Sequence, residues 1–156
     1  MSSRETAVAD LSDLPVLKEV VQRSAMVPIA KKIVMTRDLG VHGNLFGGTL
    51  MAWIDEAAAA FATEYCFTPN MVTVRVGEFL FRKPLKAGNH VRIYAAVARL
   101  GTTSITLNVE ARRYSLYSGE ETLVCTTSIT FVRIDDDGTP TPIGETVRHR
   151  HALNAA

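Results

Sequence analysis

A glycine pair in front of a carboxylate-bearing helical segment is the strongest sign of chemistry in this sequence. Gly47 and Gly48 directly precede residues 49–65, TLMAWIDEAAAAFATEY, in which Asp55 stands among apolar residues. The first N–H groups of a helix lack intrahelical acceptors and carry a partial positive charge, so they can bind a developing oxyanion. Glycine lets a substrate carbonyl approach these groups closely. An oxyanion donor of this kind is typically worth about 3–4 kcal/mol of transition-state stabilisation.

Asp55 is the candidate general base or nucleophile. Neighbours such as Trp53 and Ile54 would desolvate its carboxylate, which is costly, and proton transfer or nucleophilic attack is one reason to keep a carboxylate in such surroundings. Asp55 lies seven residues after Gly48, which is about 10 Å along a helix. Glu56 points about 100° away around the same helix, so it is a secondary candidate.

Purely structural explanations of these residues stay open at this point. Asp55 could pair with a core arginine, for which Arg75 and Arg112 are the candidates. Structural ion pairs of that kind also perturb a carboxylate. Gly47 and Gly48 could form only a tight loop, and the polar side chain of Asn44 could satisfy its own backbone.

The elements that must position these residues follow from the apolar periodicity. Residues 49–65 are rich in strong helix formers and apolar nearly all round, which predicts a helix buried on most of its surface. Residues 29–36 are a candidate strand, and a glycine-rich loop follows. A change of the apolar face at Gly77 predicts a β-bulge there. Period-two alternation predicts further strands over residues 72–76, 91–97, 105–111 and 123–134.

Short polar turns between these strands favour antiparallel hairpins. The expected fold class is therefore α+β, with an antiparallel sheet curled around one long central helix. A single sheet leaves an open edge, so association with further copies is expected. We expect residues 1–26 to form an N-terminal extension with a short helix, residues 27–135 the folded domain, and residues 136–156 a polar C-terminal tail that is ordered only in part.

The composition is that of an ordinary globular domain with little net charge. The chain has 156 residues, of which 47 % are hydrophobic and 21 % charged, and its formal net charge is +1. These values argue against a disordered or disulfide-stabilised chain. They also leave no strong overall field to attract nucleic acid or a membrane surface, so neither is expected as a partner.

The compartment expected from the sequence is the cytoplasm. The longest uncharged stretch, residues 39–54, is shorter than the about 20 apolar residues of a spanning helix, and the N-terminus lacks the apolar core of a secretory signal. Cys66 and Cys125 lie in apolar surroundings, which indicates buried thiols in a reducing compartment rather than a nucleophile. No metal is expected, because no acid or cysteine stands at ligand spacing from the histidines His42, His90, His149 and His151.

Four motifs together resemble the hot-dog thioesterase superfamily, in particular the broad-range acyl-CoA hydrolases of the YciA and brain acyl-CoA hydrolase type. The resemblance covers about residues 28–132 and implies the hot-dog fold. The matching motifs are GNLFGG at 43–48, TLMAWIDEAA at 49–58, FxxPLxxG at 81–88 and LGTTSI at 100–105.

The resemblance implies a thioesterase that cleaves acyl-CoA with no cofactor beyond the coenzyme A of its substrate. The acid that matches Asp55 acts as base or nucleophile on the thioester. The polar residue that matches Asn44 positions water or substrate, and a backbone N–H near Gly47 or Gly48 polarises the carbonyl. Asn44 and Asp55 come from different subunits of a homodimer, and such dimers often assemble into hexamers as trimers of dimers.

The resemblance also implies a binding site for the phosphates of coenzyme A. Backbone N–H and hydroxyl groups at a turn suit that task, and Arg82 and Lys83 are the candidate basic residues. An ordinary hairpin beside two solvated bases is the alternative. Phe46 is a candidate for substrate contact, although it could also only pack. The residues of the candidate turn are Gly101, Thr102, Thr103 and Ser104.

Two other functions of the same fold compete with hydrolysis. A non-catalytic acyl-CoA sensor is possible because fold does not fix function, but a regulator of this kind normally carries a DNA-binding domain, and the N-terminal extension has room for one helix at most. A hydratase or dehydratase would need an aspartate–histidine pair, and His42 is the only histidine near the helix in sequence. A serine hydrolase is disfavoured because the sequence has no G-x-S-x-G motif.

Overall fold

The computed structural model of this protein describes residues 26–155, so the short helix expected in the N-terminal extension lies outside the described residues. None of the described helices is long and apolar enough to cross a lipid bilayer. The elements are β1 (Val27–Ile33), the 3₁₀ helix η2 (Thr36–Asp38), α2 (Gly47–Cys66), β2 (Met71–Val76), β3 (Leu80–Phe81), β4 (His90–Leu100), β5 (Ser104–Tyr114), β6 (Glu121–Arg133) and α3 (Glu145–Ala155).

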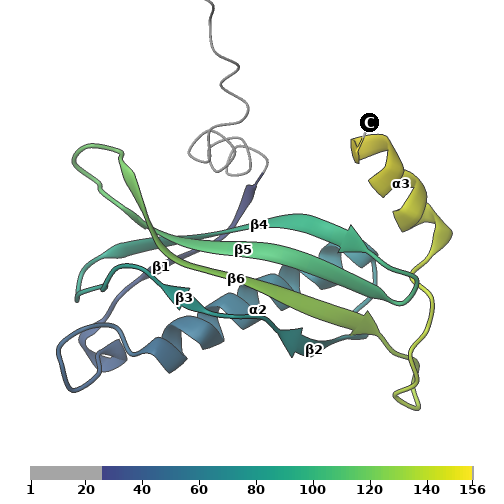
Figure 1. The fold of residues 1–156 in the computed structure, drawn as a ribbon, viewed down its shortest axis with the longest axis horizontal. Helices are drawn as coiled ribbons and strands as arrows, with labels where there is room; N and C mark the ends of the chain where they lie inside the picture. Colours follow the sequence, from purple (N-terminus) through teal and green to yellow (C-terminus); the bar gives the residue numbers. More distant parts are fainter. Residues whose placement is uncertain (1–25, 156) are drawn as a thin grey trace, which may run out of the picture.

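One antiparallel sheet wraps around the long helix α2 (Figure 1). The strands follow the order β1-β4-β5-β6-β2, and the short strand β3 pairs with β6 beside β2. The helix contacts β1, β2, β4, β5 and β6. The apolar residues that alternate along β4, β5 and β6 face the helix and form the core with it. The predicted α+β architecture, a curled sheet around a central helix, is confirmed.

The helix α2 is slightly longer than its predicted range of residues 49–65, because it begins at Gly47 and ends at Cys66. It terminates where Phe67 takes a left-handed conformation with φ of 53°, a common helix ending that is more often made by glycine. Most of its residues are buried or half-buried, as predicted, and the exposed ones form the side that the sheet does not cover. The residues of the buried side are Leu50, Ile54, Ala57, Ala58, Ala62 and Cys66.

The predicted bulge at Gly77 lies three residues earlier. The register of β2 against β6 passes from Thr73 opposite Phe131 to Arg75 opposite Thr130, so Val74 is the extra residue. Gly77 has a different constraint, because a Cβ atom there would lie 2.5 Å from the Oγ atom of Ser128. A close approach to β6 therefore accounts for this glycine. The apolar residues change face after Gly77 because the strand is interrupted between β2 and β3.

The C-terminal segment is more regular than its sequence suggested. Instead of a partly ordered tail it forms α3 at one end of the sheet (Figure 1). Ile143 and Val147 are each only 2 % exposed and belong to the core. The hydroxyl of Tyr65 lies 2.7 Å from Nδ1 of His151, which ties α3 to α2. With so few apolar residues, the segment has no clear helical periodicity, and tertiary contacts hold it in place.

Truncation of Ile54 tests the packing of α2 against the sheet. Its side chain is fully buried, so Ile54→Ala leaves a cavity and should lower the free energy of unfolding by about 2–5 kcal/mol. The control is Glu64→Ala, an exposed position of the same helix, which should change that free energy by no more than about 0.5 kcal/mol. Chemical denaturation of both variants measures the difference. A decrease in the free energy of unfolding of less than about 1 kcal/mol in Ile54→Ala would contradict this packing.

Candidate active site

Asp55 lies on the flank of α2 that faces β2. Its side chain is half-buried, and the hydroxyl of Thr73 donates a hydrogen bond of 2.9 Å to Oδ1 of Asp55. The carboxylate is therefore less desolvated in one chain than its sequence neighbours suggested, because only the edge strand β2 lies against α2 on this side. The contact with Thr73 was not predicted. Its only trace in the sequence is a polar position in the alternating pattern of β2.

The expected alternative partner of Asp55, a core arginine, is engaged elsewhere. Arg112 contacts Oε2 of Glu110 at 2.8 Å and Oε2 of Glu121 at 3.0 Å, and its guanidinium lies 3.8 Å from the ring centroid of Tyr94. No ion pair of Asp55 is found among residues 26–155. Arg75, the other candidate, is exposed on the edge strand β2. The interpretation of Asp55 as half of a core ion pair is therefore wrong for the single chain.

The N-terminus of α2 offers open backbone donors. Phe46 is the N-cap residue and makes no side-chain capping bond, so the N–H groups of Gly47 and Gly48 have no acceptor within the helix. The ring of Phe46 explains one glycine, because a Cβ atom at Gly48 would lie 2.9 Å from it. A Cβ atom at Gly47 would make an ordinary contact with Phe81 at 3.5 Å. The geometry is that of a helix N-terminus able to bind an anion.

A cavity of about 380 Å³ brings several predicted residues together at this helix end. The Oδ1 atom of Asn44 accepts a hydrogen bond of 2.7 Å from Nζ of Lys86. Asn44 is thus held by a distant lysine rather than by its own backbone, a contact that the sequence did not indicate. The predicted residues that line the cavity are Asn44, Gly47, Arg82 and Lys83.

The two parts of the candidate site do not meet within one chain. Asp55 is absent from the residues that line the cavity beside Gly47, and it lies about 10 Å further along α2 than Gly48. A base must lie within about 3 Å of the group from which it takes a proton, directly or through one water. One carbonyl therefore cannot contact the helix N-terminus and Asp55 of the same chain together.

The predicted phosphate-binding residues are also separated. The carbonyl of Thr103 accepts a hydrogen bond from the N–H of Arg133 near the end of β6, whereas the N–H of Arg82 donates to the carbonyl of Val124. Val124 and Arg133 are nine positions apart in β6, which corresponds to about 30 Å of strand. Arg82 and Lys83 are consequently not neighbours of the turn Gly101–Ser104 in the same chain.

The secondary candidates lie on the surface. Glu56 is exposed on α2, and His42 is exposed in the loop before it. His42 and Phe46 both line a second cavity of about 540 Å³ on that loop. Within the part of the chain that the structure describes, no three histidine, cysteine or acidic side chains cluster as metal ligands would.

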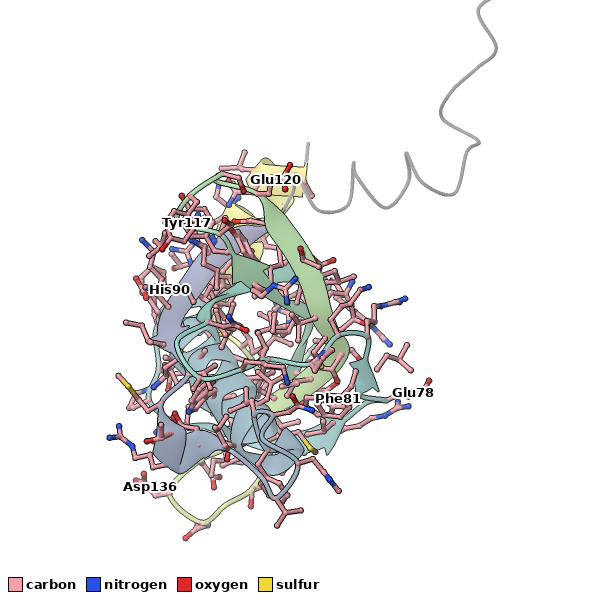
Figure 2. The ribbon with its side chains drawn as sticks, turned by 90° about the vertical axis from the view of Figure 1, so that its left-hand side faces the viewer. Glu78, Phe81, His90, Tyr117, Glu120 and Asp136 are labelled. Atoms are coloured by element: carbon pink, nitrogen blue, oxygen red, sulfur yellow. The ribbon has the colours of Figure 1, made fainter. Side chains whose placement is uncertain are left out.

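The edge of the sheet beside Asp55 is exposed and apolar. Phe81 and Glu78 lie at this edge, on the opposite side of the molecule from His90 (Figure 2). Within β2, Val74 is 55 % exposed, and the apolar side chains around it are also open to solvent. The exposed apolar residues of β2 and β3 are Val72, Val74, Val76, Leu80 and Phe81.

The fold is that of the hot-dog thioesterases, and the comparisons with known proteins agree. The sequence profile of the thioesterase superfamily matches residues 42–120. The acyl-CoA thioester hydrolase YciA of Salmonella typhimurium is 32 % identical over 118 residues, which are 74 % of this chain and 88 % of that protein. The chain belongs to the thioesterase superfamily.

Solved structures show the same relationship. HI0827, a hexameric broad-specificity acyl-coenzyme A thioesterase, superposes with a TM-score of 0.73 at 29 % identity, covering 83 % of this chain and 90 % of that one. An acyl-CoA hydrolase of Staphylococcus aureus, solved in complex with butyryl-coenzyme A and coenzyme A, gives a TM-score of 0.70 at 27 % identity, covering 85 % and 84 %. The predicted hot-dog fold is thereby confirmed.

The two described cysteines are free and buried, which should make them unreactive. Burial raises the pKa of the Cys125 thiol to about 11, and burial likewise raises the pKa of Cys66. Because the thiolate is the reactive form, both should react with a disulfide reagent at pH 8 much more slowly than a solvent-exposed cysteine thiol. The absorbance of the released reagent group at pH 8 should report reaction of both thiols only after the protein is unfolded in denaturant. Rapid labelling of the folded protein would contradict this assignment.

Proposed function

We propose that this protein hydrolyses acyl-CoA thioesters to a free acid and coenzyme A, with each active site formed by two copies of the chain. The observation that carries the proposal is the separation of two complementary half-sites on one helix. Open N–H donors lie at Gly47 and Gly48, and Asp55 lies about 10 Å away. A second copy that places its helix N-terminus beside Asp55 would complete the site. Relatives named acyl-CoA thioester hydrolases support the substrate class.

In the proposed reaction, Asp55 activates the attacking oxygen. The hydrogen bond from Thr73 occupies Oδ1, which fixes the carboxylate and leaves Oδ2 to accept a proton from water. The water oxygen bonds to the thioester carbon, the C–S bond breaks, and the coenzyme A sulfur takes up the proton that Asp55 accepted. Direct attack by Asp55 would instead break the C–S bond, release the coenzyme A thiolate and give a mixed anhydride, which water then hydrolyses to the free acid and the Asp55 carboxylate.

The second copy would supply the groups that hold the carbonyl. The N–H groups of Gly47 and Gly48 would stabilise the oxyanion through the partial positive charge of the helix N-terminus. Asn44 would orient water or substrate, since Lys86 holds its Oδ1 atom and leaves the amide N–H groups free to donate.

The exposed edge of β2 is the proposed contact between the two copies. An unpaired, apolar edge strand is a template for another strand, and Thr73 of this strand contacts Asp55. A partner docked on β2 therefore lies beside the carboxylate that needs it. HI0827 is hexameric, and we propose that the dimers of this protein likewise assemble as a trimer of dimers.

A cytoplasmic location and the absence of nucleic-acid and membrane partners stay predictions. The free thiols of Cys66 and Cys125 support the first, because reducing compartments keep thiols free. The formal net charge of +1 supports the second.

Replacement of Asp55 tests the reaction directly. Asp55→Ala removes the base, so turnover measured as free-thiol release from acyl-CoA substrates should fall by at least about 100-fold. Asp55→Asn keeps the shape of the side chain and an acceptor for Thr73, and its turnover should fall by the same factor. Glu56→Ala is the matched control on the next, exposed position, and it should be the milder change. Activity of Asp55→Ala within a few-fold of wild type would remove Asp55 from this role.

A charge on the β2 edge tests the shared site. Val74→Lys should oppose docking of a second copy, because it places charges in an apolar contact. Light scattering after size exclusion should show a smaller assembly, and turnover should fall with it. Leu153→Lys changes an exposed apolar residue of α3 and should leave both unchanged. An unchanged assembly with full activity in Val74→Lys would contradict the proposed contact.

A further inference from the structure

Two carbonyl groups of the β4–β5 turn point at one nitrogen of Arg148. The Nη2 atom of this α3 residue donates to Gly101 O at 2.5 Å and to Thr102 O at 2.7 Å. The carbonyl of Thr102 also accepts a bond of 2.9 Å from the N–H of Ile143. The C-terminal segment thus covers the carbonyl side of the turn.

The same two peptide groups present their N–H ends on the opposite side. A trans peptide directs its C=O and N–H in opposite directions, and the described residues contain no cis peptide. The N–H groups of Thr102 and Thr103 therefore face away from Arg148. Neither has an acceptor among residues 26–155, and Thr102 is exposed and Thr103 half-buried, so neither donor is used within the described chain.

This arrangement suits an anion. Successive N–H groups at a turn form anion-binding sites, and the hydroxyl groups of Thr102 and Thr103 can donate as well. Arg148 occupies the carbonyl oxygens, and hydrogen bonds in series polarise one another, so the N–H groups behind them become better donors. The permanent charge of the guanidinium adds a positive potential at the turn.

The position of Arg148 is fixed by its neighbours. Val147 and Ile143 are buried in the core, and Arg148 itself is half-buried. The side chain of Arg133 donates to the carbonyl of Pro142 at 2.8 Å, which holds the segment that leads into α3. Two buried residues on the N-terminal side of Arg148, together with the bond from Arg133, hold the turn in place before any ligand arrives.

We propose that Arg148 is a positioning residue that prepares the β4–β5 turn to bind a phosphate group of coenzyme A. This inference rests on the proposed acyl-CoA hydrolase function. The resemblance already implied the turn as a phosphate site, and Arg148 is the residue that the structure adds to it. Arg82 and Lys83 were the cations predicted for this role. They lie about 30 Å from the turn along β6 of the same chain, whereas Arg148 is hydrogen-bonded to it.

The test compares two thioesters that differ in phosphate. Acyl-CoA carries the phosphates, and the acyl-pantetheine with the same acyl group carries none. In Arg148→Met the KM for acyl-CoA should rise about tenfold, which corresponds to about 1.4 kcal/mol, with kcat within about twofold of wild type. The KM for acyl-pantetheine should not change. Arg148→Lys keeps the charge and should recover part of the loss.

Arg150→Met is the matched control, because it removes the same charge from the same helix. Arg150 stacks at 4.3 Å on the ring of Phe67, away from the turn, and its loss should not affect the two substrates differently. An equal rise in KM for both thioesters in Arg148→Met would show a merely structural role and overturn the inference. An unchanged KM for acyl-CoA would also overturn it.

Calorimetric titration with coenzyme A and with pantetheine separates this inference from the proposed function, because it needs no turnover. If wild type hydrolyses no acyl-CoA, the proposed function fails. An affinity for coenzyme A that falls about tenfold in Arg148→Met, with the affinity for pantetheine unchanged, would still support phosphate binding at the turn. Equal affinities of wild type and variant for coenzyme A would overturn it.

Discussion

The packing of one face of α2 against a curled sheet is the contact on which the rest of the structure depends. Ala58 and Ala62 are small enough for the strands to approach the helix, and Leu50 and Ile54 fill the space around them. Once that face is buried, the directions of the remaining side chains follow, because residues on one helix keep their angular and axial offsets. The helix N-terminus therefore opens at one end of the molecule, and Asp55 lies on the flank beside β2.

The same geometry is the reason for proposing an active site shared by two copies. An oxyanion donor and a base must reach one carbonyl from two sides, and a straight helix holds Gly48 and Asp55 about 10 Å apart. Folding cannot shorten that distance without breaking the helix. In the proposed dimer, a second copy would bring another helix N-terminus to the flank that carries Asp55. The edge strand β2 leaves its apolar side chains exposed on that flank, so the proposed contact surface lies beside the carboxylate that the partner would complete.

The C-terminal segment adds a second contribution that the central helix does not provide. Ile143 and Val147 carry it into the core, and Arg148 then reaches the carbonyl oxygens of the β4–β5 turn. The energetic logic is that of a preorganised site, in which the protein orients donors during folding rather than during binding. A charged group that is hydrogen-bonded to the carbonyl oxygen of a peptide group polarises the N–H of the same group. A residue can therefore influence a ligand that it does not touch.

The sequence by itself determined the elements and the fold class. Alternation along residues 91–97 and 105–111, and the alanine-rich segment around Asp55, predict strands and a helix from local physics that any single chain obeys. The motif residues 43–48 and 49–58 pointed to the correct family. Only the tertiary structure decided the partners, because contacts such as Thr73 with Asp55, Lys86 with Asn44 and Arg148 with Gly101 join residues far apart in the chain. The bulge at Val74 and the helix α3 also depend on such contacts, since neither has a local periodicity strong enough to fix it.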